Sequence, residues 1–170
     1  EKEIKFESEN WKLLDGKRIY KKDSFDFKIQ SIGVQTNKEI VIIACNILLD
    51  KLTDIDSLID KDELEIKVAE NTMANCFDII LENEDYTIGK MFEYFLYSQF
   101  FEKKILTFCG FKKMHPHDNY SIIRLSYTEP VSYTEPVEKS TVKGHLKECI
   151  QLSKEVYSTM KKDFTKFDKE

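Results

Sequence analysis

Three stretches of the chain carry more apolar surface, at helical spacing, than one face of a small sheet can cover. The first follows Thr36 and Glu39, which fit a capping box and predict a helix over about residues 37–59. The second starts at Thr87 and is apolar around much of its circumference, and the third starts near Thr141. Such helices are either buried or form half of an interface. We therefore expect helices to pack on helices across a dimer-like interface.

Strand patterns separate these helices. Alternation of apolar and charged residues predicts a strand over residues 64–68, and a longer strand with apolar residues on both faces is predicted over residues 73–82. Two more strands are predicted over about residues 104–111 and 119–127. Runs of strands with helices able to cover one face are typical of α+β proteins with two layers. The predicted fold class is therefore α+β, with antiparallel sheets and long helices packed as a pseudodimer.

Turns and loops follow from local sequence. Asn71-Thr72 predicts a turn between two of these strands. A tandem repeat, Ser-Tyr-Thr-Glu-Pro-Val, fills residues 126–137, and its two prolines predict an extended loop.

The N-terminal segment is predicted to be β structure as well. Asp15-Gly16 tolerates the positive φ angles of a two-residue turn, so residues 11–20 predict a hairpin. Apolar residues at alternate positions predict a further strand within residues 24–33.

Composition excludes several classes of protein. With 170 residues the chain can bury a core, while a net charge of −5 and a pI of about 5.4 argue against a strongly basic nucleic-acid binder. The longest apolar run, residues 40–49, is interrupted by Asn46 and is shorter than the roughly 18–20 residues of a membrane span. The cysteines are widely spaced, and we expect them to be reduced and buried: Cys45, Cys76, Cys109 and Cys149.

Few residues suggest catalysis. His115 and His117 could bind a metal, but only Asp118 is a further candidate ligand, and zinc sites need three or four. A turn fixed by Pro116, with solvent-facing imidazoles, is the simpler interpretation. The sequence contains no Gly-rich phosphate loop and no nucleophile–base pair at recognisable spacing. These residues indicate a chain that is not an enzyme by itself.

Two stretches together resemble a known pair of proteins. In one, an apolar helix opens with Asp85-Tyr86-Thr87-Ile88-Gly89 and is followed by Gly110-Phe111-Lys112 and His115-Pro116. This pattern resembles the small α-like subunit of cellular RNA polymerases, and every element of that subunit has a counterpart within residues 62–166. Tyr86 replaces the family's usual His and Lys90 its usual Asn, and the doubled hexapeptide lengthens a loop that the family keeps short.

The other stretch is Ser24-Phe25-Asp26-Phe27-Lys28-Ile29-Gln30-Ser31-Ile32-Gly33. It resembles a strand near the C-terminal end of the third-largest polymerase subunit, and the helix after Glu39-Ile40-Val41 resembles that subunit's last dimerisation helix. Gln30 replaces a Glu, and Thr36-Asn37-Lys38 stands where the family has Pro-Pro-Glu. In cellular polymerases these are two chains; here they are consecutive, as in the fused α-like subunits of some large DNA viruses. The resemblance divides the chain into residues 1–60 and 61–170.

The resemblance implies a non-catalytic assembly subunit of a multisubunit DNA-dependent RNA polymerase. The implied partners are the largest and second-largest subunits, which hold the catalytic magnesium, so no cofactor is expected in this chain. Contact with DNA or RNA would be indirect, and no membrane is involved. The implied location is intracellular: a virus particle or cytoplasmic replication site for a viral protein, or the nucleus for a cellular one.

The resemblance also implies an interface and a missing partner. The residues expected at the helix–helix interface are Ile40, Ile43, Ile47, Leu48, Met91, Phe92, Phe95, Leu96, Cys149, Ile150 and Tyr157. Because the chain starts at Glu1 and lacks most of the larger subunit, we expect the absent N-terminal part to supply strands beside residues 24–33. Alone, the chain should be poorly soluble or self-associate.

Two other interpretations remain open on the residues. One is a free-standing α+β protein-interaction or nucleic-acid-binding module. The other is a small metal-dependent hydrolase that uses His115 and His117.

Overall fold

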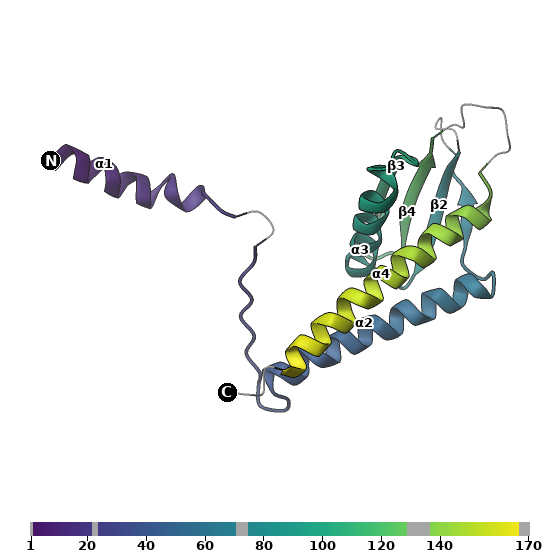
Figure 1. The fold of residues 1–170 in the computed structure, drawn as a ribbon, viewed down its shortest axis with the longest axis horizontal. Coiled ribbons are helices and arrows are strands. Elements are labelled where there is room, and N and C mark those ends of the chain that lie inside the picture. Colours follow the sequence, from purple (N-terminus) through teal and green to yellow (C-terminus); the bar gives the residue numbers. More distant parts are fainter. Residues whose placement is uncertain (1, 22–23, 71–74, 129–136, 167–170) are drawn as a thin grey trace. The chain divides into compact units, whose positions relative to one another are not determined.

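The computed structural model describes residues 2–21, 24–70, 75–128 and 137–166 (Figure 1). The chain forms two compact units, Glu1–Val34 and Gln35–Glu170. The resemblance placed a boundary at residue 60, between segments that resemble two different subunits, and this boundary stays a prediction. The compact units divide elsewhere, after Val34. The turn predicted at Asn71-Thr72 and most of the hexapeptide repeat lie outside the described residues.

The first unit contains a helix where a hairpin was predicted. Helix α1 spans Lys2–Leu13, and a short 3-10 helix spans Gly16–Arg18. The hairpin prediction is wrong because an isolated two-stranded ribbon is only marginally stable in water. The Lys- and Glu-rich sequence of α1 instead favours a helix, whose backbone hydrogen bonds close within the segment.

No strand forms over residues 24–30 of the described chain, which corrects the second N-terminal prediction. Phe25 and Phe27 are 78% and 85% exposed. A strand needs a neighbour to satisfy its backbone groups, and no strand of the described residues pairs with this segment. Gly33 ends it with a φ of 99°, a left-handed conformation that suits glycine.

The second unit contains one four-stranded antiparallel sheet, which confirms the α+β class. Its strands lie in the order β1 (Ile66–Val68), β2 (Cys76–Glu82), β4 (Tyr120–Tyr127) and β3 (Leu106–Lys112). On its buried face Ile79 of β2 lies opposite both Ile66 and Ile123. On its other face Arg124 forms two 2.6 Å hydrogen bonds with Asp78.

Three helices complete this unit. Helix α2 spans Asn37–Asp60, α3 spans Tyr86–Leu96 and continues as a π-helical turn over Tyr97–Phe101, and α4 spans Lys139–Lys166. The predicted capping box is confirmed, because Thr36 and Glu39 each accept a hydrogen bond from the other's backbone N–H. Helices α3 and α4 cover one face of the sheet, and α2 lies beside α4 (Figure 1).

The core lies between the sheet and these helices. It contains Phe92 and Leu96 of α3, Leu146 and Ile150 of α4, and Ile123 of β4, each at most 1% exposed.

The cysteines are free thiols, as predicted, and three of them are buried. Cys109 is partly buried, and burial raises the pKa of Cys109 and of Cys149 to about 12. Their thiols therefore stay protonated and pack as small apolar groups.

Among the described residues, no helix is both long and apolar enough to cross a membrane.

Candidate interaction surface

The motif that opens α3 is built around Asp85. Its carboxylate caps the helix, with Oδ1 accepting a 2.7 Å hydrogen bond from the backbone N–H of Tyr86. Oδ2 accepts a 3.0 Å hydrogen bond from Nζ of Lys113, which follows β3, and these two bonds hold the pKa of Asp85 below its ordinary value. Thr87 is exposed and Ile88 is buried. The motif therefore fixes the start of α3 and ties it to the β3–β4 hairpin.

Gly89 is needed for the packing of α3 on β3. A Cβ placed on Gly89 would lie 1.9 Å from Cε2 of Phe111, so the aromatic ring occupies the space that a side chain would need. The ring also packs edge-to-face on Tyr86, with centroids 5.3 Å apart, and Nζ of Lys90 lies 5.8 Å from its centroid. At Gly110 the added Cβ would meet Cζ of Phe108 at 3.0 Å. The glycines of the predicted motif thus admit aromatic rings.

The His-Pro loop forms the exposed β3–β4 turn. The rings of His115 and His117 lie 5.2 Å apart, and Nδ1 of His115 accepts a 3.2 Å hydrogen bond from the backbone N–H of His117. Pro116 between them is exposed. Within the described part of the chain, no three His, Cys, Asp or Glu side chains are grouped to hold a metal ion. The geometry therefore offers no support for the hydrolase interpretation.

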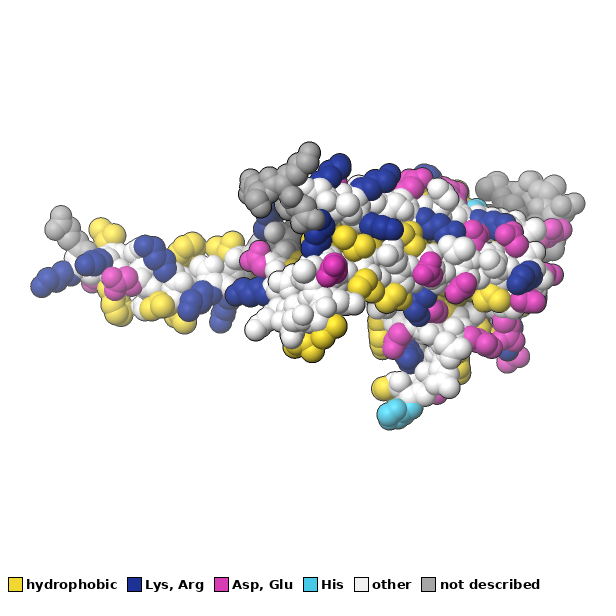
Figure 2. Space-filling view, turned by 90° about the horizontal axis from the view of Figure 1, so that it is seen from below, with side chains coloured by type: hydrophobic (Ala, Val, Ile, Leu, Met, Phe, Trp, Pro, Cys, Tyr) yellow, Lys and Arg dark blue, Asp and Glu magenta, His cyan; other side chains and the backbone are white. Residues whose placement is uncertain are grey.

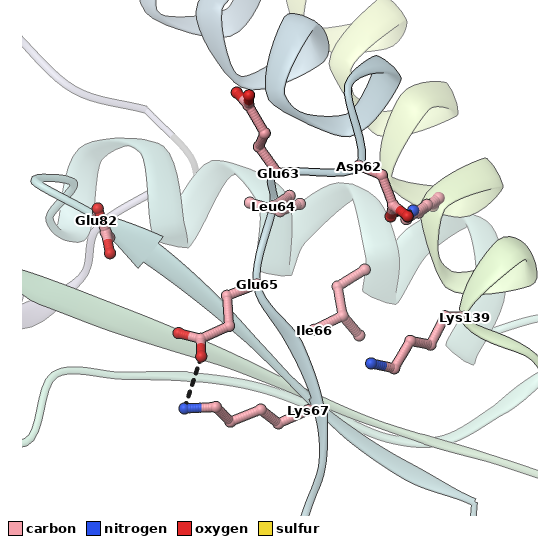
Figure 3. A pocket seen from close by; sticks show the side chains of 9 residues that line it. Asp62, Glu63, Leu64, Glu65, Ile66, Lys67, Glu82 and Lys139 are labelled. Atoms are coloured by element: carbon pink, nitrogen blue, oxygen red, sulfur yellow. Dashed lines mark hydrogen bonds and ion pairs between the residues drawn. The ribbon is translucent and has the colours of Figure 1, made fainter.

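A pocket of about 680 Å³ lies where α2, β1 and the start of α4 meet (Figure 3). Two of its three lysines are paired: Lys67 lies 2.8 Å from Glu65, and Lys143 pairs with Asp62. These pairs raise the pKa of Lys67 and lower that of Asp62. The residues that line the pocket include no hydroxyl, thiol or imidazole. The lining brings together four carboxylates and three ammonium groups, so its opposite charges largely offset one another.

His145 of α4 occupies a semi-buried position that the sequence did not single out. Its ring lies 4.0 Å from that of Phe100 and 5.6 Å from that of Tyr127, measured between centroids. Nδ1 lies 3.0 Å from the hydroxyl of Tyr127. Burial raises the pKa of Tyr127 well above its ordinary value, so the phenol keeps its proton. Burial also favours the neutral form of His145.

We expect the stability of this protein to fall as the pH falls below about 6.5. Burial lowers the folded-state pKa of His145 from 6.5, an effect that Glu148 opposes. The contribution of neutral His145 to the free energy of unfolding is therefore complete at pH values above its unfolded-state pKa. It is lost as the pH falls through its folded-state pKa. Urea denaturation at pH 7.5 and at pH 5 should show a lower midpoint at pH 5. The drop should be smaller in His145→Gln, and an equal drop in both proteins would contradict this assignment.

The long helices extend beyond the sheet as a two-helix arm. Helix α2 has 24 residues and α4 has 28, whereas the longest strand has eight. At 1.5 Å per helical residue and about 3.4 Å per strand residue, α2 is about 36 Å long and the sheet about 27 Å. We define the arm as residues 37–49 of α2 and 156–166 of α4, which lie side by side (Figure 1). Near its tip, Nζ of Lys38 donates a 3.2 Å hydrogen bond to the carbonyl oxygen of Thr165.

The predicted interface residues divide between the core and the arm. Buried in the core are Phe92, Leu96, Cys149 and Ile150, and partly buried are Ile40, Leu48, Met91, Phe95 and Tyr157. Exposed are Ile43, by 38%, and Ile47, by 52%. Ile47 therefore lies outside the core of this chain, and its place at a helix–helix interface stays a prediction.

One side of the arm is apolar and uncovered. On α2, Lys51 follows Ile43 and Ile47 at helical spacing, so the three side chains lie along one stripe. Nζ of Lys51 lies 2.6 Å from a carboxylate oxygen of Glu84, which follows β2. The stripe therefore faces the side on which the sheet lies. On α4, Val156 and Met160 follow Cys149, a core residue, at spacings of seven and eleven. Val156 is 51% exposed and Met160 is 42% exposed. We call Ile43, Ile47, Val156 and Met160 the apolar arm face.

The first unit is also rich in exposed apolar side chains. Helix α1 buries none of its residues, and Trp11 is 52% exposed. Ile32 and Val34 are 96% and 85% exposed. A segment with no core of its own, and with this much apolar surface, is typical of one that orders fully against a partner. Hydrophobic side chains are also visible among charged ones along the molecule in Figure 2.

No protein-family model matches this sequence, and no curated protein is significantly similar to it. The resemblance to α-like polymerase subunits therefore stays a prediction from the two motifs.

Proposed function

We propose that this chain is a non-catalytic assembly subunit of a multisubunit DNA-dependent RNA polymerase, combining the tail of the larger α-like subunit with the small α-like subunit. The observation that carries the proposal is the apolar arm face, because α2 and α4 together expose apolar residues that nothing in the described chain covers. A monomeric protein with no partner rarely leaves such surface open.

The motif geometry supports the same proposal. Asp85 and Gly89, which carry the resemblance to the small subunit, set the start of α3 and its distance from β3. Their role is to hold a scaffold in shape, which is what an assembly subunit requires. The catalytic magnesium would belong to the large subunits.

The exposed residues 24–30 support the larger-subunit part of the proposal. Phe25 and Phe27 lie at alternate positions and are both exposed, as expected of a strand whose neighbour belongs to another segment. We propose that the N-terminal part of the larger α-like subunit supplies that neighbour, in the same polypeptide or as a second chain.

The test is affinity purification of the tagged full-length chain from the organism that makes it. We expect recovery of two polypeptides, each several times larger than this chain, in a complex that extends RNA on a DNA template when supplied with magnesium. Recovery of the chain alone, or with partners that have no polymerase activity, would favour the free-standing interaction module instead.

A further inference from the structure

A row of ion pairs joins α2 to α4 along one seam. Nζ of Lys154 lies 3.1 Å from a carboxylate oxygen of Asp56. Towards the sheet, Lys147 pairs with Asp60, and Lys143 pairs with Asp62 just after α2 ends. Because the helices are antiparallel, each step forward along α4 corresponds to a step backward along α2.

The row is interrupted in the arm. Seven residues before Asp56 lies Leu49, and seven residues after Lys154 lies Lys161, so these two occupy the next position along the seam. Leucine offers no charge to the lysine. Among the described residues, no carboxylate pairs with Lys161. The seam therefore has an unneutralised lysine opposite an apolar residue.

A groove lies at this position. It has a volume of about 440 Å³ and is lined by Leu49, Ser158, Lys161, Lys162, Thr165 and Lys166. None of these lining residues is acidic, although the whole chain has a net charge of −5. Lys166 has a weak contact with Asp163, at 3.6 Å, and both side chains are largely exposed. Lysine and arginine side chains also gather in a row along one border of the molecule in Figure 2.

We propose that this groove binds an acidic peptide segment of a partner protein that inserts an apolar side chain. Leu49 and the aliphatic stems of the lysines would contact the apolar side chain, while the ammonium groups of Lys161 and Lys162 would pair with flanking carboxylates. Phosphates of a nucleic acid could pair with the lysines, but they would leave the apolar floor unused. The proposed site lies on the seam between the helices and is separate from the apolar arm face.

The probe is a fluorescein-labelled peptide, Glu-Glu-Asp-Leu-Phe-Glu-Asp-Leu-Leu-Glu-Asp-Glu, titrated with the full chain and followed by fluorescence anisotropy. We expect saturable binding that weakens as salt rises. Replacing Lys161 and Lys162 together by Ala should weaken binding about tenfold. The matched control replaces two exposed lysines of α1, Lys5 and Lys12, by Ala, and should leave the affinity within about twofold of the unmodified chain.

Leu49 allows a second test that does not depend on removing charge from α4. Leu49→Glu places a carboxylate opposite Lys161 and completes the row of ion pairs. It should therefore weaken peptide binding more than Leu49→Gln, whose side chain has the same shape as glutamate but no charge. The thermal midpoint of Leu49→Glu should be no lower than that of Leu49→Gln. Equal affinity of the unmodified chain and the double lysine variant would overturn the proposal. So would the absence of saturation at about 1 mM peptide, or tighter binding of an oligothymidylate than of the peptide.

Discussion

Replacing Gly89 by Ala is expected to lower the free energy of unfolding by about 3 kcal/mol, the upper range for forcing extra volume into a packed core. The added methyl group would lie 1.9 Å from Cε2 and 2.2 Å from Cδ2 of Phe111. The ring cannot move aside easily, because it packs on Tyr86, and because the backbone N–H of Phe111 donates a 2.9 Å hydrogen bond to Glu93. The clash must therefore separate α3 from β3.

The chain provides a matched control for this substitution. Gly144 is also helical, and a Cβ there would meet no atom within 4 Å. Gly144→Ala should therefore stabilise the protein by up to about 1 kcal/mol, because alanine loses less backbone entropy in a helix. Urea denaturation of both variants measures the two effects. Destabilisation of the same size at Gly144 would show that the loss at Gly89 is not due to Phe111.

A double mutant separates this clash from a general loss of stability. Phe111→Leu removes the ring and should itself cost stability, since it leaves a partly filled space beside Gly89. In that background, however, Gly89→Ala should cost much less than in the unmodified chain. Costs that simply add would contradict direct contact between the two positions.

The helices of the second unit could be predicted from sequence because their signals are local. The capping box at Thr36 and Glu39 fixes the start of α2, and apolar spacing sets the direction of its buried side. The hairpin over residues 11–20 failed for the opposite reason. Whether Asp15-Gly16 turns a hairpin depends on a neighbouring strand, and the described chain provides none.

The motif residues could be found from sequence, but their contacts could not. Resemblance drew attention to Gly89, yet only the structure shows that Phe111, more than twenty residues later, occupies its side-chain space. The groove at Leu49 and Lys161 was missed although both residues lie at predicted helical positions. The groove could be found only from the spacing of charged residues on two helices. Comparing those spacings requires knowing that α2 and α4 are antiparallel, and knowing which residues of the two helices lie opposite each other.

The apolar arm face was predicted only in part, because exposure depends on where the sheet ends. Periodicity assigned Ile43 and Ile47 to the same stripe as the core residues of α2, but it could not tell that the sheet would not reach them. The excess of apolar surface was nevertheless visible in the sequence. What the structure adds is its location, on side chains of α2 and α4 that are exposed and lie outside the core.

Replacing Ile47 and Val156 together by Glu is expected to abolish recovery of the large polypeptides with this chain. Both side chains are about half exposed, so the charges stay hydrated in the free protein, and its thermal midpoint should hardly change. In a complex that covers the arm face, each substitution loses the burial of an apolar side chain, about 1.5–3 kcal/mol, and also buries an unpaired charge. Together they should weaken association by at least about a hundredfold.

The control carries the same charge change elsewhere on the second unit. Val68 at the sheet edge and Ile105 before β3 are 68% and 40% exposed, and replacing both by Glu should leave the recovered complex intact. Quantitative co-purification of the two variants, with circular dichroism to check folding, measures the difference. If both variants lose the partners, the added charge alone disrupts the complex. If neither variant loses them, the partners do not bind at the apolar arm face. Loss from the Ile47 and Val156 variant alone would place the partner on the arm, since both variants keep the same fold and the same net charge.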